Sequence, residues 1–316
     1  MALDLDTIKW LTDVFGKNVK FNEPMSKHTS LRVGGPAESY VIPETIEALK
    51  SLINRAWQKD IPYLIVGEGT NLLVNDRGVR GIVIVLSKCL KKIWHTARTP
   101  QEVMVTAMAG VRMQTLCRYA IDRGLAGLNF ALGIPGTVGG GIVMNAGTAY
   151  GWIEDVLETI SLLLPTGEIL KISRDRLKFS YRGLACDLGK NQIYQDQAVI
   201  VDGSFSLKCA DPQTLKQEAD KILKKRKQRQ PTEIPSAGCF FKNPTFEKSA
   251  GELIELAGLK GRSIGGAEVS TKHANFLVNT GKASAADFLA LMELVQETVY
   301  KKFNIDLERE VKIVGT

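Results

Sequence analysis

The apolar residues of this chain are spaced in two ways, which alternate from one segment to the next. Three stretches place them at helical spacing, and Thr45 stands as an N-cap before the second stretch. Helices are therefore predicted over 5–15, 45–60 and 112–124. Short apolar runs bounded by turn residues predict strands over 36–43, 63–66, 81–86, 103–110 and 198–207. A longer run with Pro-Thr-Gly at its centre predicts a hairpin over 157–172.

The pattern changes near residue 208. Strands predominate before this point, with helices between them. A helix then starts near Pro212 and ends in the basic run KKRKQR at 224–229. Further helices are predicted near 249–258 and 284–303, and strands near 274–278 and 310–314. We therefore expect a domain boundary that divides the chain into 1–207 and 208–316.

Composition is that of a soluble globular protein, with 44% hydrophobic and 24% charged residues. The sequence has no apolar run of the ~20 residues that cross a bilayer, and its acidic amphipathic start differs from a secretory signal. We expect a cytoplasmic protein without a membrane partner. The net charge of +7 suits an anionic small ligand as well as nucleic acid. Because the basic run lacks interleaved aromatic residues, it indicates a solvated helix end and no nucleic-acid partner.

The cysteines and histidines do not form a metal-site or disulfide pattern. The five cysteines include no CxxC pair, their number is odd, and the chain has three histidines. No metal is therefore expected. Four of the cysteines are predicted to be buried as small hydrophobic residues, and the fifth, Cys239, is considered below.

The stretch from Gly133 to Gly147 reads GIPGTVGGGIVMNAG and contains no charged side chain. Its six glycines leave backbone N–H groups accessible, and a glycine-rich turn of this kind forms a concave site for phosphate or pyrophosphate. The alternative is an ordinary turn-rich loop. Ordering six glycines costs more conformational entropy than such a loop needs. We interpret the stretch as a ligand cradle.

A second glycine motif, GEGTN at 67–71, follows a predicted strand. A Rossmann dinucleotide site needs G-x-G-x-x-G between a strand and a helix. Here the third glycine is missing and the motif continues into NLLVNDRG, which is typical of a loop. The sequence therefore excludes a Rossmann site at this position.

Together, the Gly133–Gly147 stretch, GEGTNLL and HTSLRVGGPAE resemble the UDP-N-acetylenolpyruvoylglucosamine reductase (MurB) family, the flavoenzymes of peptidoglycan synthesis. Later segments agree in family order, namely KFSYRG, PSAGCFFKNP, GGAEVSTKHANFLVN and LEREVKIVG. The resemblance extends from about residue 20 to 316. The chain length resembles the shorter subtype, which lacks an extra substrate-capping insertion.

The resemblance implies an α+β fold, with a vanillyl-alcohol-oxidase-type (PCMH-like) FAD-binding domain and a smaller α/β substrate-binding domain. Residues 1–207 would form the FAD-binding region in two α+β subdomains, with 20–207 matching the family, and 208–316 the substrate-binding domain. FAD would be held non-covalently, with backbone N–H groups at its pyrophosphate. The residues implied in FAD binding are Gly67, Glu68, Gly69, Thr70, Asn71, Leu72, Gly133, Ile134, Pro135, Gly136, Thr137, Gly139, Gly140, Asn145, Ala146 and Gly147.

The reaction of the family has two halves. NADPH passes a hydride to FAD, and flavin N5 then passes it to the enolpyruvyl ether of UDP-N-acetylglucosamine, which is protonated once to give UDP-N-acetylmuramate. The resemblance assigns Arg182 to the substrate carboxylate, because a guanidinium offers a planar fork for that group. It assigns Glu310 to polarising the same carboxylate as a protonated or proton-sharing group.

Cys239 stands where many members of the family have a proton-donating serine. A thiol, with an ordinary pKa of about 8.5, is mostly protonated at neutral pH and is a stronger acid than an alcohol. It can therefore donate the same proton. The alternative is a buried apolar cysteine without a chemical role.

Two further assignments follow from the family blocks. Glu308 lies two residues from Glu310, and on a strand both side chains would point to the same face, so only the position in the block favours Glu310. Arg and Lys side chains suit the anionic diphosphate of the substrate. The residues implied in substrate binding are Tyr181, Arg229, Lys242 and Asn243.

Two other functions stay open at this point. A sugar or alcohol oxidase with the same fold and flavin predicts rapid reaction with oxygen and no need for the three catalytic residues together. A non-enzymatic nucleotide-binding module predicts a colourless protein with salt-sensitive RNA binding. Because all three catalytic blocks occur in family order, the sequence favours the NADPH-dependent reductase, acting without an obligate protein partner.

Overall fold

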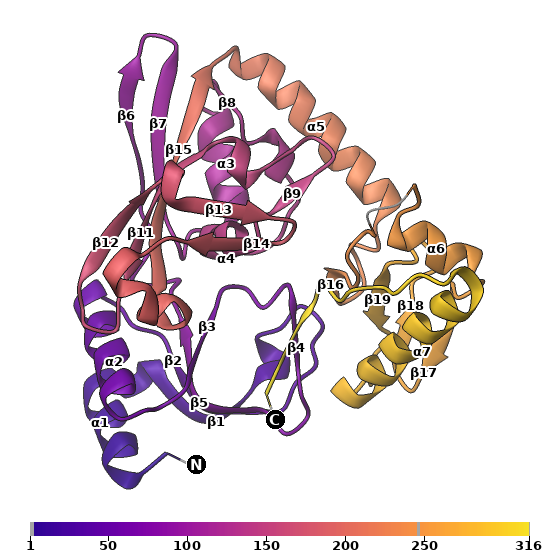
Figure 1. Ribbon diagram of the computed structural model, residues 1–316, viewed down its shortest axis with the longest axis horizontal. Helices are drawn as coiled ribbons and strands as arrows, with labels where there is room; N and C mark the ends of the chain where they lie inside the picture. The colour runs from indigo at the N-terminus through magenta and orange to yellow at the C-terminus, as the bar shows by residue number, and fades with distance from the viewer. Residues whose placement is uncertain (1–2, 245–246, 316) are drawn as a thin grey trace.

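The computed structural model describes residues 3–244 and 247–315, arranged in three packed parts (Figure 1). The first part is a four-stranded sheet of order β1-β2-β5-β3, in which β2, β5 and β3 are parallel and β1 is antiparallel. Its elements are α1 (Leu5–Phe15), β1 (Val19–Pro24), β2 (Pro36–Val41), α2 (Ile46–Gln58), β3 (Tyr63–Val66) and β5 (Val79–Val85).

Both helices of the first part begin at a capping side chain. The Asp4 carboxylate accepts the N–H of Thr7 at 2.7 Å, and the Thr45 hydroxyl accepts that of Ala48 at 3.1 Å. The apolar stripes predicted from the sequence then pack Leu11 and other buried side chains onto one face of the sheet. The predicted helices over 5–15 and 45–60 are confirmed.

The second part is an antiparallel sheet of order β12-β11-β15-β7-β6, with β8 also paired to β15. Helices α3 and α4 pack against this sheet, and the buried ring of Phe205 on β15 contributes to the core between them. Its elements are β6 (Ile93–Thr99), β7 (Glu102–Met108), α3 (Met113–Ile121), β8 (Leu125–Ala126), α4 (Val138–Val143), β9 (Gly147–Thr148), β10 (Gly151–Trp152), β11 (Leu157–Leu163), β12 (Ile169–Ser173), β13 (Leu177–Ser180), β14 (Gly183–Cys186) and β15 (Val199–Cys209).

Several elements of this part have no counterpart in the sequence predictions, among them β6 and the β13–β14 hairpin. Strand β6 is almost wholly exposed along its length, so it carries no apolar run that would mark a strand. The hairpin β13–β14 is short, and its residues are mostly exposed or half-buried. By contrast, the hairpin predicted over 157–172 is present as β11 and β12.

Helix α5 (Pro212–Arg229) leads from β15 to the third part (Figure 1). The third part is a sheet of order β16-β19-β18-β17 covered by two helices, with Phe240 stacked on Phe288 in its core. Its elements are β16 (Ser236–Cys239), α6 (Ala250–Leu256), β17 (Ser263–Ile264), β18 (Ala267–Val269), β19 (Phe276–Asn279) and α7 (Ala285–Phe303). Ala219 of α5 packs into the core of the second part, although it lies beyond the predicted boundary near 208. The boundary stays a prediction.

The first and third parts are joined by segments far apart in sequence. Strand β4 (Leu72–Val74) pairs in parallel with β20 (Lys312–Val314), the yellow strand beside it in Figure 1. The Asp76 carboxylate accepts the N–H groups of Ala285 and Ala286, at 2.8 and 3.0 Å, in the first turn of α7. Asn279 donates to the carbonyl of Leu31 at 2.9 Å. These contacts fix the GEGTN turn, which precedes β4, against the third part.

Candidate active site

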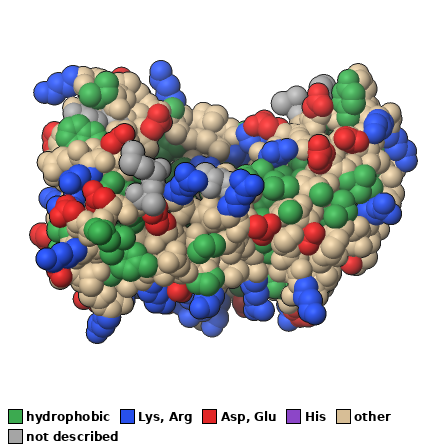
Figure 2. Space-filling view, turned by 90° about the horizontal axis from the view of Figure 1, so that it is seen from below, with side chains coloured by type: hydrophobic (Ala, Val, Ile, Leu, Met, Phe, Trp, Pro, Cys, Tyr) green, Lys and Arg blue, Asp and Glu red, His purple; other side chains and the backbone are tan. Residues whose placement is uncertain are grey.

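A cavity of about 800 Å³ lies where the three parts meet. Seen from below, the surface is hollowed between the two sides of the molecule, and Lys and Arg side chains lie beside the hollow (Figure 2). The volume is in the upper part of the range of about 300–1,000 Å³ that is typical of sites for small ligands and cofactors. The cavity is lined from the first part by the GEGTN turn, from the second by the glycine-rich stretch, and from the third by β16.

The two glycine motifs form one wall of this cavity by packing directly against each other. A Cβ atom on Gly67 would lie 2.6 Å from the hydroxyl of Thr137, so no other residue fits there without a shift. Gly136, with φ +112°, turns the chain so that its N–H donates to the Glu68 carboxylate at 3.2 Å. Glu68 is in turn 2.5 Å from Nε of Arg112. This wall of nearly bare backbone fits a ligand that must approach main-chain atoms closely.

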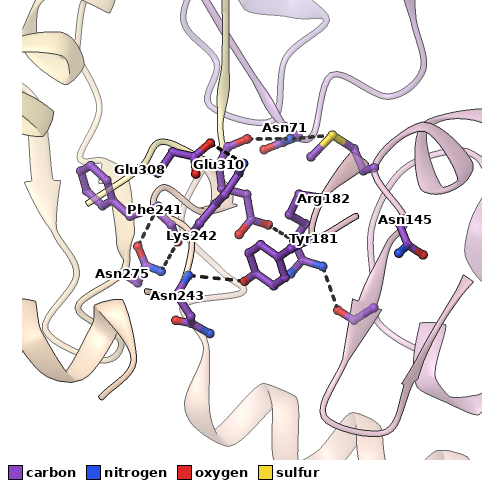
Figure 3. A network of polar contacts seen from close by, with 12 residues as sticks. Asn71, Asn145, Tyr181, Arg182, Phe241, Lys242, Asn243, Asn275, Glu308 and Glu310 are labelled. Atoms are coloured by element: carbon purple, nitrogen blue, oxygen red, sulfur yellow. Dashed lines mark hydrogen bonds and ion pairs between the residues drawn. The ribbon is translucent and has the colours of Figure 1, made fainter. Parts of the chain in front are cut away.

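Arg182 lies at the turn between β13 and β14, with φ +60°. Its Nε donates to the Glu310 carboxylate at 2.6 Å, and its Nη1 donates to the carbonyl of Gly147 at 3.4 Å. The guanidinium also lies over the rings of Trp152 and Tyr181, about 5 Å from each centroid. These contacts hold the guanidinium at the cavity wall, with 16% of the side chain exposed (Figure 3).

Glu310 reaches the same point from the other side of the cavity. Its backbone N–H donates to the carbonyl of Phe240 at 2.8 Å, and 13% of its side chain is exposed. Burial raises the pKa of its carboxyl, and the nearby Arg182 opposes that shift. Glu308, in contrast, is 72% exposed and pairs with Lys242.

The expectation that both glutamates would point to the same face is wrong. Strand β20 begins only at Lys312, and before it Arg309 makes an isolated bridge to Phe241. Because residues 308–311 are not a regular strand, the period of two does not hold there. The cavity therefore receives Glu310 and not Glu308.

Cys239 ends β16, at a point where the pairing with β19 is irregular and Gly238 has φ +79°. The thiol faces the cavity and is partly buried. Burial and then the nearby Glu310 carboxylate raise its pKa to about 12, while Arg182 and Arg226 act in the opposite direction. The thiol is therefore protonated at neutral pH, as a proton donor must be.

Comparison with known proteins decides the family. Residues 230–314 match the family model described as UDP-N-acetylenolpyruvoylglucosamine reductase, C-terminal domain, and residues 37–173 match that of an FAD binding domain. The UDP-N-acetylenolpyruvoylglucosamine reductase of Desulfosudis oleivorans is 47% identical over 97% of this chain and 98% of its own length. That of Clostridium novyi is 40% identical over 100% of this chain and 98% of its own length. The chain belongs to the UDP-N-acetylenolpyruvoylglucosamine reductase family.

A solved structure agrees with this assignment. The UDP-N-acetylenolpyruvylglucosamine reductase (MurB) of Thermus caldophilus has a TM-score of 0.76 and 34% identity, covering 92% of this chain and 97% of its own. The predicted fold class is thereby confirmed, as are the FAD-dependent oxidoreductase class and the shorter subtype.

Most of the residues implied in FAD binding line the cavity. They are Gly67, Glu68, Gly69, Thr70, Asn71, Leu72, Ile134, Pro135, Gly136, Thr137, Gly139, Gly140, Ala146 and Gly147. Gly133 and Asn145 lie outside the lining. Gly133 packs against the Arg226 side chain, and the buried Asn145 donates to the carbonyl of Ser180, which supports the hairpin that carries Arg182.

Of the residues implied in substrate binding, some line the cavity and others lie outside it. Asn243 lines the cavity and donates its N–H to the Tyr181 hydroxyl at 3.4 Å, whereas Lys242 pairs with Glu308 outside it (Figure 3). Arg229, the last residue of α5, is exposed and lies outside the lining, which receives Arg226 from the preceding turn. Other lining residues that the sequence did not indicate include Arg112, Gln230, His273 and Lys312.

Proposed function

We propose that this chain reduces the enolpyruvyl ether of UDP-N-acetylglucosamine to UDP-N-acetylmuramate, with NADPH as the reductant, in the synthesis of peptidoglycan precursors. The observation that carries the proposal is the meeting of Arg182, Cys239 and Glu310 in one glycine-lined cavity. These residues come from three separate segments of the chain. A flavin oxidase has no need for this combination of a cation, a proton donor and a second acid.

FAD, when bound, accepts electrons from NADPH and supplies the hydride that adds to the terminal carbon of the enolpyruvyl group. The residues implied in holding it are those of the GEGTN turn and the glycine-rich stretch, whose bare backbone leaves room for the pyrophosphate. The protein must then orient the substrate, stabilise the charge that develops toward its carboxylate, and deliver one proton.

Three side chains fit these tasks. As the C=C bond becomes a single bond, negative charge develops at the carbon that bears the carboxylate, and Arg182 stabilises it through its planar fork. Glu310, whose carboxyl has a pKa raised by burial, would share a proton with the same carboxylate. Cys239 transfers its thiol proton to the carbon, which completes the lactyl ether, and the thiolate is reprotonated from solvent.

An anaerobic titration followed by visible absorbance tests this function. The holoenzyme is expected to bleach with NADPH and to regain its yellow colour with enolpyruvyl-UDP-N-acetylglucosamine. Bleaching without recovery would show a flavoenzyme with another acceptor, and rapid recovery with oxygen alone would favour an oxidase.

The proposed substrates also indicate where in the cell the reaction takes place. Among the helices of the described residues, none is long and apolar enough to cross a membrane. The proposed substrates are a nucleotide-activated sugar and NADPH, both small molecules of the cytoplasm, where we place the protein. The proposed reaction requires no protein partner.

Arg226 is expected to bind the anionic part of the substrate. Burial lowers the pKa of its guanidinium, and the side chain lies against Gly133 at the cavity wall. Arg226→Met should raise the KM for the enolpyruvyl substrate about 10- to 100-fold, because losing a hydrogen bond to a charged group weakens binding by about that factor. Arg229→Met, one turn later on the exposed end of α5, is the matched control. Equal effects of the two variants in steady-state kinetics would contradict this assignment.

Substrate binding is expected to take up a proton at Glu310. In the free protein the carboxylate of Glu310 pairs with Arg182. A substrate carboxylate on Arg182 places a second negative charge nearby, which raises the pKa of Glu310 further above its already raised value. Between the two pKa values the Kd therefore increases with pH, by up to about tenfold per pH unit for one proton.

Calorimetry of the oxidised holoenzyme in buffers of different ionisation enthalpy measures this uptake, because no turnover occurs without NADPH. Glu310→Gln should bind the substrate without proton uptake. The same uptake in Glu310→Gln would assign the proton to another group.

A further inference from the structure

The segment 239–243 carries the proposed proton donor at one end and a lining asparagine at the other. Strand β19 pairs with this part of the chain only as far as Cys239, whose partner in the ladder is Phe276. Residues 240–242 form no ladder pair with β19, so their backbone groups need other hydrogen-bond partners.

Asn275 supplies those partners from the residue before β19. The Phe240 N–H donates to the Asn275 carbonyl at 2.9 Å. The Phe241 N–H donates to Oδ1 of Asn275 at 3.0 Å, and Nδ2 of Asn275 donates back to the Phe241 carbonyl at 2.8 Å (Figure 3). The asparagine is 2% exposed, so these bonds are shielded from water. Its side chain thus continues the strand pairing beyond Cys239.

The opposite edge of the same segment holds Glu310. The Phe240 carbonyl accepts the N–H of Glu310 at 2.8 Å, and the Lys242 N–H donates to the carbonyl of Glu308 at 2.8 Å. Residues 240–242 are therefore bonded on one edge by Asn275 and on the other by the segment that carries Glu310. The relative placement of Cys239 and Glu310 depends on this short stretch of backbone.

We propose that Asn275, which does not line the cavity, is a positioning residue that sets the placement of the Cys239 thiol relative to Glu310. The inference rests on the proposed function, because it needs Cys239 as the donor. An amide suits the position because the Phe241 backbone has one N–H donor and one carbonyl acceptor. The Asn275 side chain has the matching acceptor oxygen and N–H donor, and it is short enough to bond both groups. Leucine, of similar shape, would leave both groups of Phe241 buried without a partner.

Asn275→Leu should leave the reduction of bound flavin by NADPH unchanged and slow its reoxidation by the enolpyruvyl substrate. A misplacement on the order of 1 Å costs a rate of about 10²-fold. Asn279→Leu is the matched control, since Asn279 is a buried asparagine of β19 that bonds Leu31 and Gly281 and not residues 240–242. It should lower the melting temperature without this selective slowing.

Asn275→Asp gives a readout that a loss of stability alone would not give. A protonated aspartic acid has one O–H donor and one acceptor oxygen and can replace the amide, whereas an ionised one repels the Phe241 carbonyl. Reoxidation by the variant, divided by that of the unchanged protein at each pH, should therefore increase as the pH falls. Charged or titratable groups near this segment include His273, Cys239, Lys242, Glu252, Glu255, Glu268, Asp287, Glu308, Arg309 and Glu310. Dividing the two rates at each pH removes the effects that these groups have on both proteins.

Stopped-flow absorbance of the holoenzymes measures both half-reactions. If Asn275→Leu slows them equally, or no more than Asn279→Leu does, the positioning role is wrong. A flat ratio against pH for Asn275→Asp would overturn it as well, and this holds even if the leucine variant fails to fold. If the unchanged protein shows no reoxidation by the enolpyruvyl substrate, the proposed function fails instead.

Discussion

Replacing Cys239 with alanine is expected to slow the reoxidation of flavin by the enolpyruvyl substrate by about 10²- to 10⁴-fold, the usual contribution of a general acid. Reduction of the flavin by NADPH should stay largely unchanged, because that half needs no proton from the thiol. The burial that raises the pKa of Cys239 to about 12 keeps the proton in place until negative charge develops on the substrate carbon. Stopped-flow absorbance under anaerobic conditions separates the two halves.

Two further variants sharpen this experiment. Cys239→Ser retains a hydroxyl donor and should recover most of the rate that alanine loses. Cys117→Ala removes another buried thiol, one that lies in the core of the second part beside the Leu128 carbonyl, and should slow neither half. If Cys239→Ala slows both halves equally, or neither, the proton comes from another group.

Replacing Arg182 with methionine is expected to lower kcat by about 10²- to 10³-fold, as the loss of one preorganised donor to a developing charge does. It also leaves Glu310 buried without its cation, so the pKa of that carboxyl should rise further. Arg182→Lys restores the charge without the planar fork and should recover only part of the activity. Lys178→Met removes an exposed charge from β13 of the same hairpin and serves as the control.

A double-mutant cycle tests whether Arg182 and Glu310 act as a pair. Adding Glu310→Gln to Arg182→Met removes the unpaired carboxylate, so the second substitution should cost less than it does alone. Steady-state kcat and KM for the four proteins give the coupling. Strict additivity would show that the 2.6 Å contact has no part in the rate.

The sequence predicted the elements that bury an apolar stripe or run. Helices α1 and α2 and the β11–β12 hairpin were found because their burial leaves a periodic pattern. Strand β6 and the β13–β14 hairpin were missed because their side chains are largely exposed and leave no such pattern. The hairpin matters most, since it presents Arg182.

Through the family resemblance, the sequence indicated many of the residues that line the cavity, and their roles stay predictions. The role of a single side chain still depended on orientation, which local sequence does not determine. Arg226 and Arg229 belong to one basic run, and only the packing of α5 shows which of them faces the cavity. Glu308 and Glu310 could not be separated by strand periodicity, because that segment is not a regular strand. Asn275 was missed because its partner, Phe241, lies 34 residues away.

The pairing of β4 with β20 has a consequence for biosynthesis. The GEGTN turn runs into β4, whose Leu72 pairs with Lys312, and the Lys312 N–H donates to the Asn71 carbonyl at 3.0 Å. These partners are separated by about 240 residues of chain. At a synthesis rate of about 5–20 residues per second, the ribosome needs roughly 10–50 s to cover that interval. The GEGTN turn and β4 therefore lack these hydrogen-bond partners until translation has passed residue 312. Flavin binding in this cavity is therefore expected late in synthesis, and a chain that ends before residue 310 has neither Glu310 nor the β20 strand that pairs with β4.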